Sequence, residues 1–339
     1  MSFLLSCILK YPVPYNFNEI AGIKTVGDFE EMAMKAFIYQ YFNNSVYRSF
    51  CDHLGIGPGK ISGIFQIPFL PIQLFKGHKI VSGEGEVEKI FRSSGTTAGG
   101  QSSHFLLHES MYQQSLLEGF RRVFGDPSGY SFLGLLPGYL ERPDSSLIYM
   151  VNELMKQSSQ QNNVFFKEPD DGLLKTISYN QLNNIPTILF GVAFSLLRFA
   201  DQNPVSLKGV ILIETGGMKG QEEEITRTEL HERLMNGFGL EKIFSEYGMT
   251  ELLSQAYSVR EEEFILPPWM HVMMREINDP FNYVDDQRAG GINVIDLANI
   301  YSCCFISTQD LGKKTSPNTF EVLGRFDNSD IRGCNLLYS

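Results

Sequence analysis

The sequence predicts an α/β fold, in which a mainly parallel sheet is flanked by helices and joined to a smaller β-rich part. Short apolar runs, such as Ser131–Leu136 and Thr187–Val192, recur through the middle of the chain. Runs of this kind are typical of strands that are buried on both faces. Segments with helical spacing alternate with them, which favours a parallel sheet. Several runs end at glycines, and in such sheets ligands bind at the carboxyl ends of the strands.

Composition places the chain among packed globular proteins and excludes several classes of function. It has 339 residues, of which 43% are hydrophobic and 20% charged, which suffices for one large domain with an ample core. The net charge of −11, with no basic block, argues against partners such as nucleic acid or an anionic membrane surface. No apolar run reaches about 18 residues, so no stable membrane insertion is expected. Residues 1–10 have no basic segment before their apolar run, which argues against a signal peptide.

The cysteines predict a cytoplasmic protein with free thiols. Cys7, Cys51, Cys303, Cys304 and Cys334 form neither a CxxC pair nor a zinc-binding spacing, and their number is odd. Cys303 and Cys304 lie in an apolar segment, so we expect them in the core.

The chain is expected to form a single domain over residues 1–339, and its first part, about 1–85, reads as mostly helical. Residues 26–54 carry apolar side chains at helical spacing and acidic residues near the start. Residues 55–75 hold Gly and Pro at short intervals and read as loop and edge structure. Because Pro68 and Pro71 interrupt it, Ile64–Phe75 is expected to be extended.

Residues 86–260 are expected to form the α/β core with the nucleotide site. A short strand at Glu88–Phe91 enters a glycine-rich loop, and a helix follows over His108–Phe124 with Met111 and Phe120 inward. The further expected strands are Ser131–Leu136, Asn162–Phe166, Thr187–Val192, Leu207–Gly217 and Lys242–Gly248. The further expected helices are Ser145–Gln157, Ala193–Asp201 and Thr226–Phe238, the last with Thr226 and Glu229 spaced as a capping box.

Residues 261–339 are richer in short strands and turns. Gly290–Asp296 and Ser302–Ser307 read as strands. Residues 158–163 and 313–319 read as surface loops.

The stretch Arg92–Gln101 is the first candidate for a ligand site. It combines hydroxyl side chains with three glycines after a predicted strand, and hydroxyls with exposed backbone N–H groups can surround a phosphate. It differs from the Walker pattern because no Lys follows the last glycine. A plain turn is the alternative interpretation. The candidate phosphate-binding residues are Ser93, Ser94, Gly95, Thr96 and Thr97.

Four motifs, in order along the chain, together resemble one family. Ser93–Gly99 is similar to the phosphate loop of the adenylate-forming enzymes, the acyl-CoA ligase superfamily. Tyr247–Glu251 (Tyr-Gly-Met-Thr-Glu) resembles their Tyr-Gly-x-Thr-Glu motif, and Thr308–Gly312 resembles their Thr-Gly-Asp motif with Gln309 in place of glycine. Gly324–Asp327 is similar to their Gly-Arg-x-Asp hinge, and Arg332-Gly333 follows it. Within the superfamily, Leu136–Met150 and Gly324–Leu337 most resemble the acyl-protein synthetases of bioluminescence-type fatty acid reductases.

The resemblance implies ATP-dependent activation of a carboxylic acid and assigns roles in it. Thr250 would donate to the α-phosphate and Glu251 would bind Mg²⁺, whose preferred ligands are hard oxygens. Tyr247, followed by Gly248, would stack on adenine. Taken alone, Glu251 could simply interact favourably with the dipole at the start of a helix, and Tyr247 could be a core residue.

Further roles concern the rest of the nucleotide. Gly216 and Gly217 would give the adenine edge room to approach, Asp310 would accept hydrogen bonds from both ribose hydroxyls, and Arg325 would donate to the ribose. Taken alone, Asp310 could cap a turn and Arg325 could form a surface ion pair. A histidine near the loop, His104 or His108, could bind phosphate or be structural.

Two departures from the family shape the functional expectation. The loop carries Gln101 where the family has a Lys, and the chain ends shortly after Asp327, so we expect the family's mobile C-terminal domain to be absent. Cys334, beside Arg332 and Gly333, is then the candidate acyl acceptor, because a thiolate is a strong nucleophile. The expected substrate is a fatty acid, with ATP and Mg²⁺ as cofactors and an acyl reductase as partner. A compact acyl- or aryl-CoA ligase and a non-catalytic nucleotide-binding subunit remain as alternatives.

Overall fold

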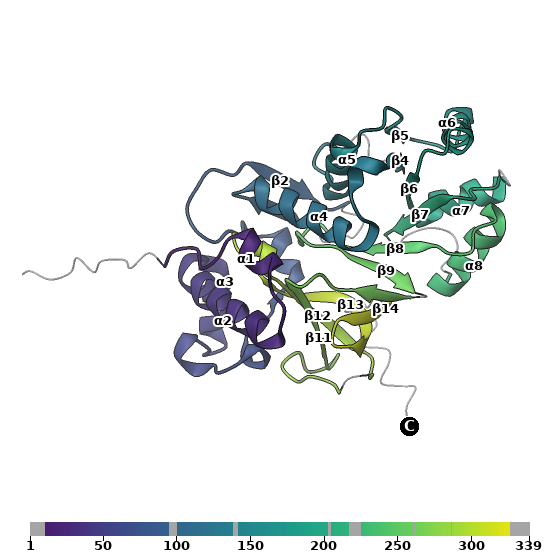
Figure 1. Ribbon diagram of the computed structural model, residues 1–339. Coiled ribbons are helices and arrows are strands. Elements are labelled where there is room, and N and C mark those ends of the chain that lie inside the picture. Colours follow the sequence, from purple (N-terminus) through teal and green to yellow (C-terminus); the bar gives the residue numbers. More distant parts are fainter. Residues whose placement is uncertain are drawn as a thin grey trace, which may run out of the picture.

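The computed structural model describes residues 11–94, 100–137, 142–202, 205–216, 225–260, 262–285 and 287–325. Its centre is a twelve-stranded sheet with the strand order β11-β12-β13-β14-β10-β9-β8-β7-β6-β4-β5, in which β1 also pairs with β13. A two-stranded hairpin, formed by β2 (Lys89–Arg92) and β3 (Ser103–Leu106), lies beside this sheet (Figure 1). In the described part of the chain, no helix is both long and apolar enough to cross a bilayer.

The parallel half of the sheet has the strand order β5-β4-β6-β7-β8. Its strands are β4 (Ser131–Leu135), β5 (Val164–Phe166), β6 (Thr187–Val192), β7 (Val210–Thr215) and β8 (Phe244–Tyr247). Alternate residues of its central strands enter different cores: Phe132 and Ile188 pack in one cluster, Leu133 and Leu189 in the other. Both faces are therefore buried, which explains why these strands read as continuous apolar runs.

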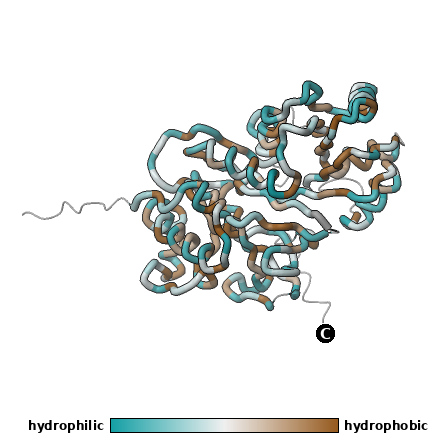
Figure 2. The backbone as a smooth tube through the Cα atoms, viewed as in Figure 1, coloured by the Kyte–Doolittle hydropathy of each residue, from teal (hydrophilic) through white to brown (hydrophobic). Residues whose placement is uncertain are grey.

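Helices cover both faces of the parallel half. The helices are α4 (Glu109–Phe124), α5 (Ser146–Gln157), α6 (Asp171–Leu182), α7 (Ala193–Gln202) and α8 (Arg227–Phe238), with a 3₁₀ turn, η4 (Pro127–Gly129), after α4. Helices α4 and α5 contribute their apolar residues to the cluster that contains Phe132, whereas α6, α7 and α8 contribute to the cluster that contains Leu133. The apolar colouring follows the strands and the inner faces of these helices, and hydrophilic residues lie mostly outside (Figure 2).

The other half of the sheet is antiparallel and continues the same sheet from β8. Its strands are β9 (Ala256–Arg260), β10 (Glu263–Ile265), β11 (Met270–Arg275), β12 (Gly290–Asp296), β13 (Phe305–Ser316) and β14 (Thr319–Arg325), with η5 (Leu297–Asn299) before β13. The N-terminal elements α1 (Phe17–Ala21), α2 (Val26–Asn43) and α3 (Ser45–His53) lie beside β11–β13 in Figure 1. Phe37 and Tyr47 of these helices contact the ring of Phe305, so this packing joins the start of the chain to β13.

Most expected elements are found, and three expectations need correction. Ile64–Phe75 is not simply extended, because 3₁₀ turns flank a two-residue strand. Pro68 and Pro71 lie in the extended part between the turns, and a proline restricts only its own φ and the residue before it. Residues 313–319 are not a surface loop: β13 runs through Ser316 and β14 begins at Thr319, and Lys313 Nζ lies 3.1 Å from Glu321 Oε2 across the pair. The turns and short strands here are η1 (Pro58–Lys60), η2 (Ile64–Gln66), β1 (Leu70–Pro71) and η3 (Ile72–Lys76).

The third correction concerns helix starts. At Thr226 only one hydrogen bond of the expected capping box is found among the described atoms, from the Glu229 N–H to the Thr226 hydroxyl. Complete capping boxes instead begin α1, between Asn16 and Glu19, and α2, between Thr25 and Asp28. Helix α6 has no counterpart among the expected elements.

Candidate nucleotide site

The predicted site residues converge from four parts of the fold. Ser93 and Ser94 follow β2 (Lys89–Arg92), Gly216 follows β7, and Tyr247 to Glu251 end and follow β8. Asp310 and Arg325 lie on β13 and β14, where they are register partners. Gly95, Thr96, Thr97, Gly217 and Cys334 lie outside the described residues, so their assigned roles stay predictions.

The hydroxyl-rich loop and the Thr-Glu motif meet through Ser102. The N–H of Ser93 donates to the carbonyl of Ser102 (3.1 Å), and the N–H of Ser102 donates to the hydroxyl of Ser93 (2.9 Å). The Ser102 side chain interacts with the carboxyl group of Glu251 and opposes the rise of its pKa. One short chain of contacts therefore joins the base of the loop to the predicted magnesium ligand.

Glu251 suits a magnesium ion that arrives with the nucleotide. Its side chain is buried, and this burial raises the pKa of its carboxyl group despite the opposing effect of the Ser102 side chain. A cation beside it would restore the charged form. A single carboxylate is also the usual protein share of a Mg²⁺ site in which phosphate oxygens and water supply the other ligands. In the described part of the chain, no cluster of three or more His, Cys, Asp or Glu side chains could bind a metal without such help.

The strand after the loop, β3 (Ser103–Leu106), holds the Thr-Glu motif from the other side. Its His104 is fully buried, and Nδ1 of the ring lies 2.8 Å from the carbonyl oxygen of Thr250. Burial lowers the pKa of His104 to about 4, so the ring is neutral at pH 7 and Nδ1–H donates to that carbonyl. The other ring nitrogen is buried with no hydrogen-bond partner among the described atoms. His104 is therefore a structural support of Thr250.

Tyr247, Asp310 and Arg325 form a second group on the adjoining strands. The hydroxyl of Tyr247 donates to Oδ2 of Asp310 (2.9 Å), and Nε of Arg325 lies 3.8 Å from Oδ1 of the same carboxylate. Edge-on contacts with Phe264 and Phe320 cover the ring of Tyr247, which is 7% exposed. The contact with Asp310 places two predicted nucleotide residues together, and adenine stacking on Tyr247 stays a prediction.

Two glycines at the strand ends have identifiable roles. Gly216 has φ +77°, a left-handed conformation that glycine adopts without strain. A Cβ at Gly248 would lie 2.3 Å from Oε1 of Glu246, so a side chain at this position would require the Glu246 carboxyl group to move. Burial raises the pKa of Glu246 to about 7, and Thr215 donates a hydrogen bond to it.

Two arginines that support the site were not singled out by the sequence analysis. Nη2 of Arg142 donates to the carbonyl oxygens of Ser93 (2.7 Å) and Arg92 (2.9 Å). Arg275, which is buried, donates to the carbonyl oxygen of Thr308 (2.7 Å) behind the Asp310 motif. Both contacts link segments that are distant in sequence, so no local pattern predicted them. The one sequence feature that pointed to either arginine was the position of Arg142 within Leu136–Met150, the stretch that resembles the family.

The described thiols are unsuited to nucleophilic attack. Cys51, Cys303 and Cys304 are buried, as expected for the latter two, and burial raises the pKa of each thiol, that of Cys51 to about 12. Because the thiolate is the nucleophile, these three side chains are poor acyl acceptors at neutral pH.

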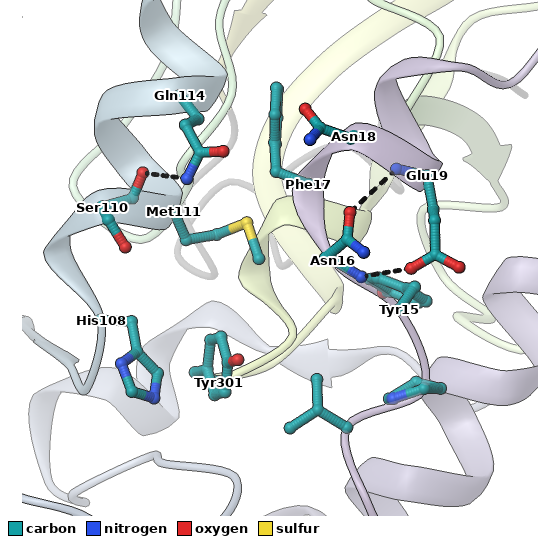
Figure 3. Close-up of a pocket in the computed structure, with 12 residues that line it drawn as sticks. Tyr15, Asn16, Phe17, Asn18, Glu19, His108, Ser110, Met111, Gln114 and Tyr301 are labelled. Atoms are coloured by element: carbon teal, nitrogen blue, oxygen red, sulfur yellow. Dashed lines mark hydrogen bonds between the residues drawn. The ribbon is translucent and has the colours of Figure 1, made fainter.

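A separate open pocket of about 520 Å³ lies between α1 and the start of α4. Asn16 and Phe17 of the α1 side face Met111, Gln114 and other residues of the α4 side (Figure 3). Of the residues considered for nucleotide binding within the described ranges, only His108 lines this pocket. The residues assigned to the base, the ribose and the α-phosphate do not line it, so the pocket is separate from the site that they form.

Comparisons with known proteins place this geometry in context. No protein-family model matches the chain. The sequence is 24% identical over 335 residues to the long-chain-fatty-acid–luciferin-component ligase of Vibrio harveyi, over 90% of this chain and 85% of that protein. Among solved structures, 2-hydroxyisobutyryl-CoA ligase in complex with 2-HIB-AMP and CoA has a TM-score of 0.68 at 10% identity, over 95% of this chain and 75% of that one. ATP-bound MatB from Rhodopseudomonas palustris has a TM-score of 0.55 at 16% identity, over 72% of this chain and 49% of that one.

These findings confirm the predicted α/β fold class and the predicted resemblance: the chain has the fold of the adenylate-forming ligases. The expectation of an enzyme of the ligase class is confirmed as well. Within that class, the sequence is similar over most of its length to a long-chain fatty acid ligase of a luminescence system.

Proposed function

We propose that this protein uses ATP and Mg²⁺ to convert a long-chain fatty acid to its acyl-adenylate. The observation that carries the proposal is the contact of Ser102 with both Ser93 and Glu251. It joins a phosphate-binding type of loop to a carboxyl group suited to Mg²⁺. The similarity to a fatty acid ligase over 90% of the chain supports the choice of acid.

The chemistry follows from the leaving group. A carboxylic acid is a poor acyl donor because its leaving group would be oxide. In the first step a carboxylate oxygen attacks the α-phosphorus of ATP, the bond to the β-phosphate oxygen breaks, and pyrophosphate leaves. Positioning and charge neutralisation supply most of the catalysis in such a step. Thr250 would donate to the α-phosphate, while His104 keeps its backbone in place.

In the second step we propose that the acyl group passes to Cys334. The thiolate attacks the acyl carbon, a thioester forms, and AMP leaves. The burial of Cys51, Cys303 and Cys304 supports a thiol elsewhere in the chain as acceptor. A thioester keeps the acyl group activated, which suits transfer to a reductase partner.

A second candidate, transfer to coenzyme A, is favoured by the similarity of the fold to a CoA ligase solved with CoA bound. A third candidate, a nucleotide-binding subunit without catalysis, predicts no reaction at all. Pyrophosphate release from ATP in the presence of fatty acids separates the third candidate from the other two. Labelled fatty acid retained on the denatured protein separates transfer to Cys334 from transfer to CoA.

The experiment measures pyrophosphate release with ATP, Mg²⁺ and saturated fatty acids of graded chain length. The proposal expects release that depends on the acid and is largest for long chains. Nucleotide binding without release for any acid would leave only the non-catalytic role.

A further inference from the structure

The positive charge that faces the phosphates of ATP is not supplied by the loop itself. From Ser93 to Leu107 the sequence contains neither Lys nor Arg. The pyrophosphate that leaves during adenylation carries several negative charges, and hydroxyl and N–H donors alone neutralise none of them. Besides Mg²⁺, a cationic side chain from another segment would therefore add favourable charge beside the loop.

Arg142 lies in the right place for this role. It follows the parallel strand β4 in the chain, yet both N–H groups of its Nη2 donate to the first two carbonyls of the loop segment, those of Arg92 (2.9 Å) and Ser93 (2.7 Å). The N–H of Arg92 in turn donates to the carbonyl of Asp144 (2.9 Å). These bonds hold residues 142–144 against the base of the loop, so the guanidinium is fixed next to Ser93.

Among the described residues of this segment, the charge balance leaves one positive charge. Arg92 and Arg142 share one carboxylate, that of Asp144, whose oxygens lie 3.4 Å and 3.7 Å from the two guanidinium groups. Two positive charges and one negative charge leave a net charge of +1. The side chain of Arg142 is 22% exposed and that of Arg92 is 44% exposed, so water screens the charge of Arg142 less.

Arg142 also has donors to spare. A guanidinium carries five N–H groups in a planar fork that suits phosphate oxygens. Nη2 uses two of them on the loop carbonyls, and within the described residues Nη1 has no hydrogen-bond partner. Arg142 can therefore hold the loop with one nitrogen and bind a phosphate oxygen with the other.

We propose that Arg142 binds the pyrophosphate portion of ATP and supplies the positive charge that the loop lacks. This inference rests on the proposed adenylation, because it specifies which residue meets the leaving group of that reaction. Arg142 is then a binding residue that also positions Ser93.

The test compares the affinities of the whole protein for ATP, pyrophosphate and AMP by isothermal titration calorimetry. Arg142→Gln removes the charge, Arg142→Lys keeps the charge without the fork, and Arg92→Gln removes a neighbouring charge that shares Asp144 but does not bond to the loop carbonyls. Thermal unfolding of each variant checks that the fold is kept.

In Arg142→Gln we expect the affinities for ATP and pyrophosphate to fall about tenfold or more, and the affinity for AMP to change less than about twofold. Arg142→Lys should lie between this variant and the wild type, and Arg92→Gln should lose much less. Raising the salt concentration should weaken pyrophosphate binding more steeply in the wild type than in Arg142→Gln, which a purely structural role would not produce.

Three results overturn the inference while leaving the proposed adenylation intact: unchanged pyrophosphate affinity in both Arg142 variants, equal losses in Arg142→Gln and Arg92→Gln, or an equal loss of AMP affinity. If Arg142→Gln does not fold, the comparison of Arg142→Lys with the wild type decides, with at least a threefold loss for pyrophosphate expected. A wild-type protein that binds none of the three ligands contradicts the proposed function itself, and this inference with it.

Discussion

The hydroxyl of Tyr247 donates a hydrogen bond to Oδ2 of Asp310 across 2.9 Å, although the two residues are 63 positions apart in the chain. This contact joins the end of the last parallel strand, β8, to the long antiparallel strand β13. Two motifs that the sequence assigns to the base and the ribose of one nucleotide therefore lie side by side.

Loss of the Asp310 carboxylate should weaken ATP binding. In the proposed function it accepts hydrogen bonds from the ribose, and charge-assisted bonds of this kind contribute about 1.5–3 kcal/mol in total. Asp310→Ala should lower the ATP affinity by that amount in a calorimetric titration. Tyr247→Phe keeps the carboxylate and removes the hydroxyl that donates to it, so it should cost less. An unaltered affinity in Asp310→Ala would rule out a ribose contact.

Glu251→Gln should affect the reaction more than nucleotide binding. The amide keeps the shape of the side chain and can still contact Ser102, but it is a weak ligand for Mg²⁺. Pyrophosphate release should fall by roughly 100-fold or more, as is usual when a charged transition-state contact is lost. The ATP affinity should fall much less, and excess Mg²⁺ should restore little activity. Release at the wild-type rate would remove Glu251 from the magnesium site.

Acid should destabilise the protein in part through His104. Burial lowers the pKa of His104 from 6.5 to about 4 in the folded state. At pH values between these two pKa values, the imidazole is therefore protonated in the unfolded chain and neutral in the folded protein. Stability is therefore lost as the pH falls from about 6.5 to about 4, by up to about 3 kcal/mol for a fully buried ring. His271, with a pKa also lowered to about 4 by burial, titrates in the same window.

His104→Gln removes one of these two titrations and keeps a hydrogen-bond donor near Thr250. The raised pKa of Glu246 opposes these titrations in the same window, so the two proteins are compared directly. In urea unfolding between pH 4 and 6.5, the wild type should lose more unfolding free energy toward acid than this variant does. Identical slopes for the two proteins would mean that His104 is not held neutral by its surroundings.

Cys334→Ser should separate activation from acyl transfer. The variant should release pyrophosphate from ATP and fatty acid, and it should lose the hydroxylamine-labile label that the wild type retains after denaturation. Cys303→Ser is the matched control, because its thiol is buried and its pKa is raised by that burial. A full label on Cys334→Ser would place the acceptor elsewhere, and no label on any variant would favour transfer to CoA.

The sequence predicted the regular elements of the fold well where one physical signal dominates. Strands β4 and β6 are buried on both faces and therefore show an uninterrupted apolar pattern. The hairpin of β13 and β14 was missed at residues 313–319 because its exposed strands are polar, and polar residues are also typical of loops. In Ile64–Phe75 the two prolines indicated an extended chain, and they do lie in its extended centre, but 3₁₀ turns form on either side because a proline restricts only itself and the residue before it.

The candidate site was predicted residue by residue but not as a network. The local motifs identified Tyr247, Glu251 and Asp310, since each lies in a short recognisable pattern. The bonds from Arg142 to Ser93 and from His104 to Thr250 join segments 49 and 146 positions apart. Only the folded chain shows such pairs, because no local spacing encodes them.

The most direct test of acyl-adenylate formation is the exchange of labelled pyrophosphate into ATP. It needs no acyl acceptor, because it measures only the reversible first step. We expect exchange that requires Mg²⁺ and a long-chain fatty acid and that is lost in Glu251→Gln. If fatty acids of every chain length give no exchange while the folded protein binds ATP, the proposed adenylation is wrong.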